Sequence, residues 1–121
     1  MIVRDVHHVN IATVDLKLTL AFYTDVLGLV DGPRPDFAVE GHWLYVGERP
    51  LVHLQLAAAP VVASTVSALN HFALQVANLD DAIARLESHG IPYRISGITG
   101  ERARQVFLQD PNGVLIELNP T

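Results

Sequence analysis

The feature that most restricts the fold of this chain is an internal duplication. The segments His8–Leu29 and His71–Leu79 each open with a histidine in an alternating, strand-like pattern and then change to the spacing of a helix. Each copy is followed at almost the same distance by a second potential metal ligand. His53 comes 45 residues after the first histidine (53 − 8), and Glu117 comes 46 residues after the second (117 − 71). The sequence therefore predicts one supersecondary unit used twice, with its chemistry at equivalent positions.

The composition favours one globular domain. The chain has 121 residues, of which 50% are apolar and 17% are charged, so it can build a core without staples. It contains no cysteine, which excludes disulfides, thiolate metal ligands and a cysteine nucleophile. The eight lysines and arginines are scattered and the net charge is −5, so we expect no nucleic-acid partner. The absence of a long apolar run and of a signal-peptide pattern predicts a soluble cytoplasmic protein with no membrane partner.

The first half is expected to follow the order β-α-β-β-β. Residues 3–13 alternate and are rich in β-branched types, which predicts a strand, and Asp15–Leu27 predicts a helix that Asp15 caps and Gly28 ends. Residues 30–41 contain two prolines and two glycines and predict a loop, with a short extended piece around Phe37–Val39. Two further strands joined by a tight turn are expected at His42–Val46 and Leu51–Leu56.

The second half restarts this order after an apolar linker. Residues 57–69 are small and apolar, so we expect them to be covered by the other half or by a second chain, or to form a short local helix. A helix capped by Asn78 or Asp80 follows, and Asp110–Gly113 predicts a hairpin turn. Strands are expected at His71–Ala77, Tyr93–Ile95, Gln105–Gln109 and Val114–Asn119. The chain is thus predicted to be a single domain of two modules, about residues 1–56 and 70–121.

Strand alternation places the polar candidates on one face of the predicted sheets. The residues that share a face are His8 with Asn10, His53 with Gln55, His71 with Gln75, and Glu117 with Asn119. The opposite faces are apolar, as two amphipathic helices require. Trp43, Tyr45 and Phe107 also fall on the polar face, where they are expected to form the aromatic walls of a small-molecule pocket.

The four duplicated positions predict a metal site. His8, His53, His71 and Glu117 supply three imidazoles and one carboxylate, which suits a divalent ion such as Zn, Ni, Fe(II), Mn or Co. With neutral histidines such a site would carry a net charge of about +1 and would favour anionic or enolate-like ligands. A single histidine in a strand is usually an ordinary core or surface residue; the prediction depends on four candidates at duplicated positions.

Five further polar residues are assigned no defined chemistry. His7 is expected to point to the other face from its neighbour, and His42 either reaches the pocket mouth or lies on the surface. His89 falls in the last turn of the second helix, where the helix dipole favours a cation. Arg102 and Arg104 either bind an anionic substrate or are simply solvated.

With these residues assembled, the chain resembles the vicinal oxygen chelate superfamily, which includes glyoxalase I, extradiol dioxygenases, fosfomycin-resistance enzymes and bleomycin-binding proteins. The stretches that carry the resemblance are HHVNIATVDLKLTLAFYTDVLGL, NHFALQVANLDDAIARLESHGI and FLQDPNGVLIEL. It implies an α+β fold in which two βαβββ modules form a cup around one divalent metal, usually in a homodimer that can pair modules across chains. In this superfamily the metal binds two vicinal oxygens of the substrate. The metal positions of the family fall here on His8, His53, His71 and Glu117.

The resemblance leaves the subclass open at position 53. Glyoxalase-I-like members have a glutamate there that binds metal and moves a proton, whereas His53 would act as a fourth ligand or as a base. Dioxygenase-like members use a triad that matches His8, His71 and Glu117. The fosfomycin-resistance type needs a basic pocket, and too few basic residues converge here.

The leading hypothesis is a metal-dependent lyase, isomerase or dioxygenase for a small substrate. His53 and Glu117 are its expected catalytic residues: Glu117 binds the metal, and His53 is a fourth ligand or the proton-transfer group. The alternative from another class is a metal-free binding protein of the bleomycin-resistance type. The net charge of −5 favours this alternative faintly, and the four ligand positions oppose it.

Overall fold

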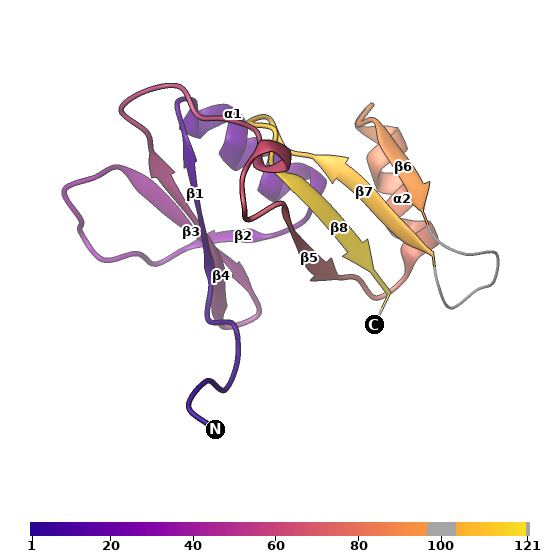
Figure 1. The fold of residues 1–121 in the computed structure, drawn as a ribbon, viewed down its shortest axis with the longest axis horizontal. Coiled ribbons are helices and arrows are strands. Elements are labelled where there is room, and N and C mark those ends of the chain that lie inside the picture. The colour runs from indigo at the N-terminus through magenta and orange to yellow at the C-terminus, as the bar shows by residue number, and fades with distance from the viewer. Residues whose placement is uncertain (97–103, 121) are drawn as a thin grey trace. The chain divides into compact units, whose positions relative to one another are not determined.

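The chain forms two compact units, which are described here one at a time. The computed structural model describes residues 1–96 and 104–120. Its first unit is Met1–Val61 and its second is Val62–Thr121, so the boundary falls within the predicted linker (Figure 1). Each unit contains one four-stranded sheet, which confirms the predicted α+β class.

The sheet of the first unit has the strand order β1-β4-β3-β2. Its strands are β1 (Val9–Thr13), β2 (Val30–Gly32), β3 (Gly41–Val46) and β4 (Arg49–Leu56). β1 runs parallel to β4, and the other neighbouring strands are antiparallel. The parallel pair is possible because α1 and the β2–β3 hairpin lie between the two strands in the sequence.

The loop predicted over residues 30–41 is wrong in its first part. The extended piece expected around Phe37–Val39 does not form, and the strand is Val30–Gly32, paired with β3. Gly32 explains part of this register: a Cβ there would lie 2.7 Å from two ring carbons of Tyr45. The edge strand can therefore approach the tyrosine ring only with a glycine at this position.

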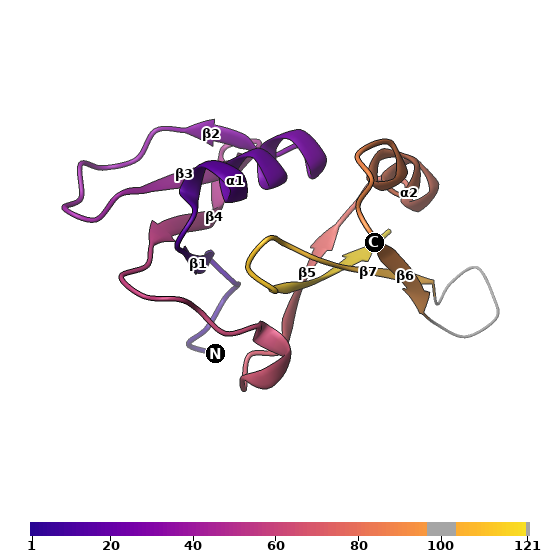
Figure 2. The same cartoon turned by 90° about the horizontal axis from the view of Figure 1, so that it is seen from above.

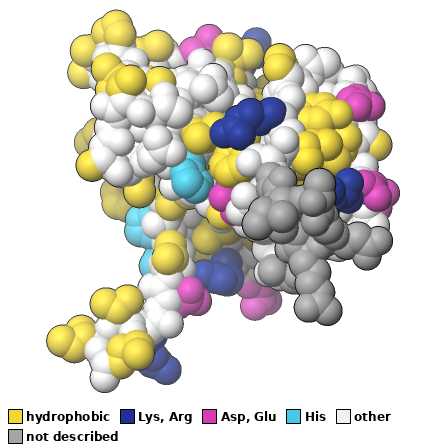
Figure 3. Space-filling view, turned by 45° about the vertical axis from the view of Figure 1, so that its right-hand side comes forward, with side chains coloured by type: hydrophobic (Ala, Val, Ile, Leu, Met, Phe, Trp, Pro, Cys, Tyr) yellow, Lys and Arg dark blue, Asp and Glu magenta, His cyan; other side chains and the backbone are white. Residues whose placement is uncertain are grey.

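The strand predicted over residues 3–13 is wrong in its N-terminal half. Pairing with β4 begins at Val9, opposite Val52, and residues 1–8 lie outside the strands. His8 is therefore the residue immediately before β1, where the alternation of a strand does not set its direction. The preceding segment extends away from the first unit with exposed hydrophobic side chains (Figure 3).

The first helix begins as predicted and changes type midway. The Asp15 carboxylate accepts a hydrogen bond from Leu18 N at 3.0 Å, which confirms the N-cap. α1 covers Leu16–Ala21, and the predicted α-helix then becomes a π-helix, η1 (Phe22–Val26). The hydroxyl of Thr24 donates to Leu20 O at 2.9 Å, a bond of the kind that disturbs a regular helical ladder.

The second unit repeats the topology of the first. Its sheet has the order β5-β8-β7-β6, with β5 parallel to β8 and the remaining pairs antiparallel. The strands are β5 (His71–Gln75), β6 (Tyr93–Ser96), β7 (Gln105–Gln109) and β8 (Leu115–Asn119). α2 (Leu79–Ser88) is capped by Asn78, which accepts from Asp81 N at 3.0 Å, and Gly90 follows its end with a φ of 67°.

The linker is not the apolar helix that the sequence allowed. It contains a single 3-10 turn, η2 (Ser64–Val66). Ser64 attaches it to the Asp110–Gly113 turn: its N–H donates to Gly113 O at 3.1 Å, and its hydroxyl accepts from Leu115 N at 2.8 Å. The apolar side chains Val62, Val66 and Leu69 are all more than 70% exposed on the described chain.

Each unit has its core between the apolar face of its sheet and its own helix (Figure 2). The buried apolar strand residues are Ile11, Leu44, Val52 and Leu54 in the first unit, and Val106, Leu108, Ile116 and Leu118 in the second. These residues confirm the predicted apolar faces, while Val46 and Leu56 at strand ends are exposed. Among the described helices, none is long and apolar enough to cross a membrane.

Candidate metal and substrate site

The duplicated histidines and their partners occupy equivalent positions in the two sheets. On β4, His53 pairs with the residue two positions after the first histidine of the duplication. On β8, Glu117 pairs with the residue two positions after the second histidine. Each predicted pair is therefore assembled within one unit by the parallel pairing of its first and last strands.

In the first unit, His53 lies within a stack of three aromatic rings. The ring centres of His8 and His53 are 3.8 Å apart and their planes differ by 9°. Trp43, the neighbour of His53 across β3 and β4, stacks on the same imidazole at 4.3 Å with an angle of 15°. Since two parallel rings cannot share one face at these distances, His53 is sandwiched between the other two.

The backbone around His53 sets its tautomer. Its Nε2 lies 3.0 Å from Pro50 O, so this nitrogen carries the proton and Nδ1 keeps its lone pair. The side chain is only 8% exposed, and this burial is the largest cause that lowers the pKa of His53 below its ordinary value of 6.5. The neighbouring His8 lowers the pKa of His53 further, whereas the hydrogen bond to the Pro50 carbonyl raises it. His53 is therefore neutral at pH 7, the form that binds metal.

The donor atoms of this pair fit a divalent ion, but their present arrangement does not. An imidazole binds metal in its ring plane at about 2.0–2.1 Å, and the stacked planes of His8 and His53 are far enough apart that one ion cannot lie in both. One ring must turn before both can bind. His8 is exposed, lies outside the strand and is held through Nδ1 only by His7 Nδ1 at 2.8 Å, so it is the ring free to turn.

In the second unit, His71 and Glu117 already face each other. His71 Nε2 lies 3.4 Å from Glu117 Oε1. His71 Nδ1 lies 2.8 Å from Asn70 Oδ1, which can only accept, so Nδ1 carries a proton and Nε2 is the ring nitrogen directed to the carboxylate. The ring of Phe107 meets the imidazole edge to face at 5.8 Å.

The carboxylate of Glu117 is held by its other oxygen. Glu117 is 8% exposed, and its Oε2 accepts from Gln105 Nε2 at 3.1 Å and from Asn119 Nδ2. Oε1 remains directed to His71. Two electron-rich atoms 3.4 Å apart suit a shared cation, because ligands at about 2.0–2.2 Å from one ion lie at about this separation. This pair fits a divalent metal both in chemistry and in arrangement.

Within residues 1–96 and 104–120, no group of three or more acidic or histidine side chains gathers at one point. Each unit supplies one pair: His8 stacks on His53 in the first, and His71 faces Glu117 in the second. A single site made by all four residues therefore stays a prediction.

A cavity of about 510 Å³ opens beside the stacked rings of the first unit. His8, Trp43 and His53 form one wall, and the loop between β2 and β3 supplies Arg34, Phe37 and Val39 to another. Its volume is within the range of small-molecule pockets. This loop is not among the pocket residues expected from the sequence. The feature that could have indicated it is an arginine and an aromatic residue close to two prolines.

The three predicted aromatic wall residues separate in the structure. Trp43 lines this cavity. Tyr45 lies away from it, with its hydroxyl donating to Pro33 O at 2.6 Å and its ring over Gly32, beyond a shift in the β3–β4 register. Phe107 lines a second cavity, of about 440 Å³, in the second unit.

The remaining histidines have local partners. His7 contacts its neighbour rather than pointing to an opposite face, because both residues precede the strand. His42 pairs with Asp31 at 3.1 Å and does not line the cavity. His89 is the C-cap residue of α2, with its Nδ1 3.0 Å from Arg85 O.

The two loop arginines also have defined outcomes. Arg104 donates to Asp80 at 3.0 Å, so it is neutralised by an acidic residue in the first turn of α2. Arg102 lies outside the described residues.

The comparison with protein families defines the class of this protein. Residues 5–118 match the sequence pattern of the Glyoxalase/Bleomycin resistance protein/Dioxygenase superfamily. Because the match covers nearly the whole chain, the protein belongs to this family. The predicted resemblance to the vicinal oxygen chelate proteins is thereby confirmed.

Three similar proteins differ in the activities that their names give. The uncharacterized protein YaeR of Escherichia coli K12 is 29% identical, over 95% of both chains. A protein named glyoxylase I 4 from Arabidopsis thaliana is 29% identical over 93% of this chain and 68% of its own length. Biphenyl-2,3-diol 1,2-dioxygenase of Paraburkholderia xenovorans is 34% identical over 85% of this chain, which corresponds to 36% of the dioxygenase.

A solved structure shows the same fold. The genomically encoded fosfomycin resistance protein of Listeria monocytogenes superposes with a TM-score of 0.77 over 98% of this chain and 92% of that chain, at 15% identity. At this identity the likeness supports the fold alone.

Proposed function

We propose that this protein is a divalent-metal-dependent enzyme that binds a small substrate through two neighbouring oxygens. The observation that carries the proposal is the His71–Glu117 pair. An imidazole nitrogen and a carboxylate oxygen face each other at 3.4 Å, and each side chain is held in that orientation through its other polar atom. Family membership and relatives named as a glyoxalase and a dioxygenase support the same assignment.

We assign the ligands to His8, His53, His71 and Glu117, held within one chain or between two copies in a homodimer. The donor set contains only nitrogen and oxygen, so Zn, Ni, Fe(II), Mn and Co all suit it. When bound, such an ion supplies Lewis-acid polarisation of the two substrate oxygens. His53 contributes as a fourth ligand or as a base, since its Nδ1 is unprotonated and its ring is neutral at pH 7.

The chain's own residues prepare the substrate. Trp43 offers an aromatic wall next to His53, and the cavity they share is large enough for a small molecule. Glu117 is held by two amide donors through one oxygen, which leaves the other to bind or to exchange a proton. Proton transfer would make the enzyme glyoxalase-like, and oxygen consumption would make it dioxygenase-like.

A metal-free binding protein is the second candidate. The stack of His8 on His53 favours it, because this arrangement serves a flat ligand better than it serves a shared ion. The support of Glu117 through its other oxygen opposes it, because it leaves Oε1 and His71 Nε2 facing each other at the separation of two ligands of one ion.

The test is elemental analysis of protein purified without a metal-affinity tag. We expect stoichiometric divalent metal in the wild type, its loss in His71→Ala, and its retention in His89→Ala, whose Nδ1 lies beside Arg85 O and Ser88 Oγ at the end of α2. An oxygen-electrode assay with a panel of catechols on the same sample separates the two chemistries. Absence of metal from the wild type, or an equal metal content in both variants, would instead support a metal-free binding protein.

A further inference from the structure

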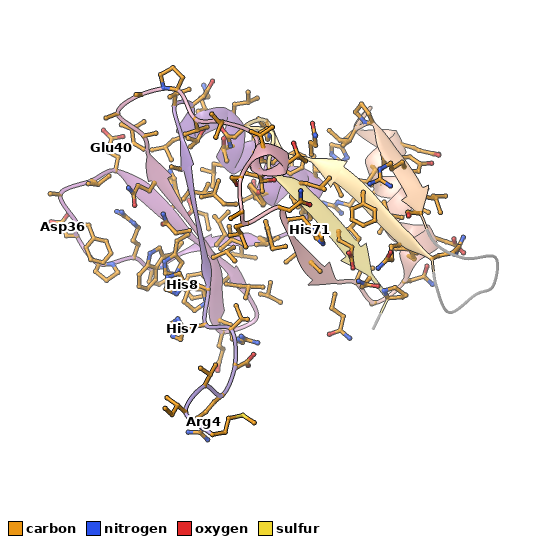
Figure 4. The ribbon with its side chains drawn as sticks, viewed as in Figure 1. Arg4, His7, His8, Asp36, Glu40 and His71 are labelled. Carbon is orange, nitrogen blue, oxygen red and sulfur yellow. The ribbon has the colours of Figure 1, made fainter. Side chains whose placement is uncertain are left out.

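Arg34 is a half-buried cation without a carboxylate partner. It lies in the wall of the cavity in the first unit, where its Nη2 donates to Val39 O at 2.8 Å. None of the ion pairs among the described residues includes it, although Asp36 is on the same loop (Figure 4). By contrast, Arg104 pairs with Asp80 at 3.0 Å. Arg34 is therefore a charge that the described chain leaves uncompensated.

The orientation of the guanidinium leaves its edge available. Its carbon lies 4.9 Å from the centre of the Phe37 ring, so one flat face is used by a cation–π contact. The N–H donors lie in the guanidinium plane, and among the described residues the one hydrogen-bond partner is Val39 O, which accepts from Nη2. A planar group approaching along the free edge can be bound by two parallel hydrogen bonds.

The surroundings favour an anionic occupant for this edge. Phe37, Val39, Trp43 and Leu54 make much of the cavity wall apolar, and Arg34 is the only lysine or arginine among its described lining residues. A partly desolvated guanidinium is costly until an anion pairs with it. One cation compensates one negative charge, which suits a carboxylate better than a doubly charged phosphonate.

We propose that Arg34 determines specificity by binding a carboxylate of the substrate, whose flat body lies against Trp43. The inference deepens the proposed function, on which it rests for the metal-binding vicinal oxygens. The carboxylate site itself is built from Arg34, Phe37 and Trp43 of the first unit and does not require the metal. It can therefore be tested with and without an ion.

The first measurement uses Trp43, the one tryptophan of the sequence, as the reporter. Metal-free protein is titrated with benzoate and with benzamide, a neutral molecule of the same shape, and tryptophan fluorescence is followed. We expect benzoate to bind at least about tenfold more tightly, as a charge-assisted bidentate contact does. Arg34→Gln should remove this preference, Arg34→Lys should keep part of it, and Arg104→Gln should keep all of it.

Several outcomes would overturn the inference. These are equal affinity for benzoate and benzamide in the wild type, an unchanged preference in Arg34→Gln, or a tighter, Arg34-dependent binding of phenylphosphonate. Thermal melting checks that each variant is folded. If Arg34→Gln is not folded, the preference of Arg34→Lys for benzoate over benzamide is measured instead, and an unchanged preference overturns the inference.

A second arm separates this inference from the proposed function. Metal-loaded protein is titrated with catechol and with 3,4-dihydroxybenzoate, which have the same vicinal oxygens and differ by the carboxylate. A metal-containing protein that does not distinguish them refutes the role of Arg34 and leaves the metal assignment standing. A protein that holds no metal but prefers benzoate through Arg34 refutes the metal assignment and supports the carboxylate site.

Discussion

The two units place a histidine and a second potential ligand at equivalent backbone positions, but they surround these side chains differently. In the second unit, Asn70 and Gln105 hold the outer atoms of His71 and Glu117, so that the two potential ligand atoms face each other. In the first unit, the His8 ring stacks flat on its partner, and its Nδ1 lies beside the Nδ1 of His7. The duplication therefore reproduces the backbone register, whereas the neighbouring side chains decide which pair is prepared for an ion.

The sharpest way to break this comparison is to remove one ligand from each unit. Glu117→Gln keeps the shape of the side chain and removes its charge, and we expect metal affinity to fall by more than about a hundredfold, because the best-arranged donor is lost. His53→Gln should cost less, since its pair must reorganise to bind. Competition with a chromogenic chelator measures both affinities. A larger loss in His53→Gln would show that the first unit holds the stronger half of the site.

A smaller effect is expected from the residues that precede the two duplicated histidines. Asn70→Ala removes the acceptor that keeps the proton of His71 on Nδ1, and we expect about a tenfold to hundredfold loss of metal affinity. His7→Ala is the matched change in the first unit and should weaken binding less, because a second imidazole does not impose one tautomer on His8. The same chelator competition applies, and equal losses would contradict the difference between the units.

The smallest effect concerns the pH dependence of stability in the metal-free protein. The pKa of His53 is lowered in the folded state, chiefly by burial, so the unfolded chain takes up the proton more readily than the folded one. The neutral His53 stabilises the folded state fully when the pH is above 6.5, the ordinary pKa of histidine. This stabilisation is lost as the pH falls from 6.5 through the lowered pKa of His53 in the folded state. Urea unfolding at a series of pH values should show a steeper decline toward acid for the wild type than for His53→Gln. Identical pH dependences would mean that the stack does not exclude the charged imidazole.

Much of the fold follows from local patterns that the sequence shows directly. Asp15 and Asn78 cap their helices because a short polar acceptor precedes an apolar periodicity. The strand Gln105–Gln109 has its predicted bounds, since alternation and the Asp110–Gly113 turn limit it on one side. These signals depend only on residues that are near one another in the sequence, so they do not depend on how distant parts of the chain pack.

Other elements depend on partners that are distant in the sequence. The first strand begins at Val9 because pairing with β4 begins there, although the alternating pattern extends further toward the N-terminus. The short strand Val30–Gly32 exists because β3 provides its partner, whereas its glycine by itself indicates a loop. The π-helix from Phe22 likewise cannot be predicted from the spacing of apolar residues, because the same spacing fits an ordinary α-helix.

The candidate site divides in the same manner. Residue types and duplicated spacing were sufficient to predict the pairs that each unit brings together, since parallel pairing of equivalent strands follows from the repeat. They could not show that His8 precedes its strand and stacks on His53, nor that Arg34 reaches the cavity from a loop. Spacing along a strand determines which positions share a face, whereas the direction of a loop side chain depends on the packing it meets in three dimensions.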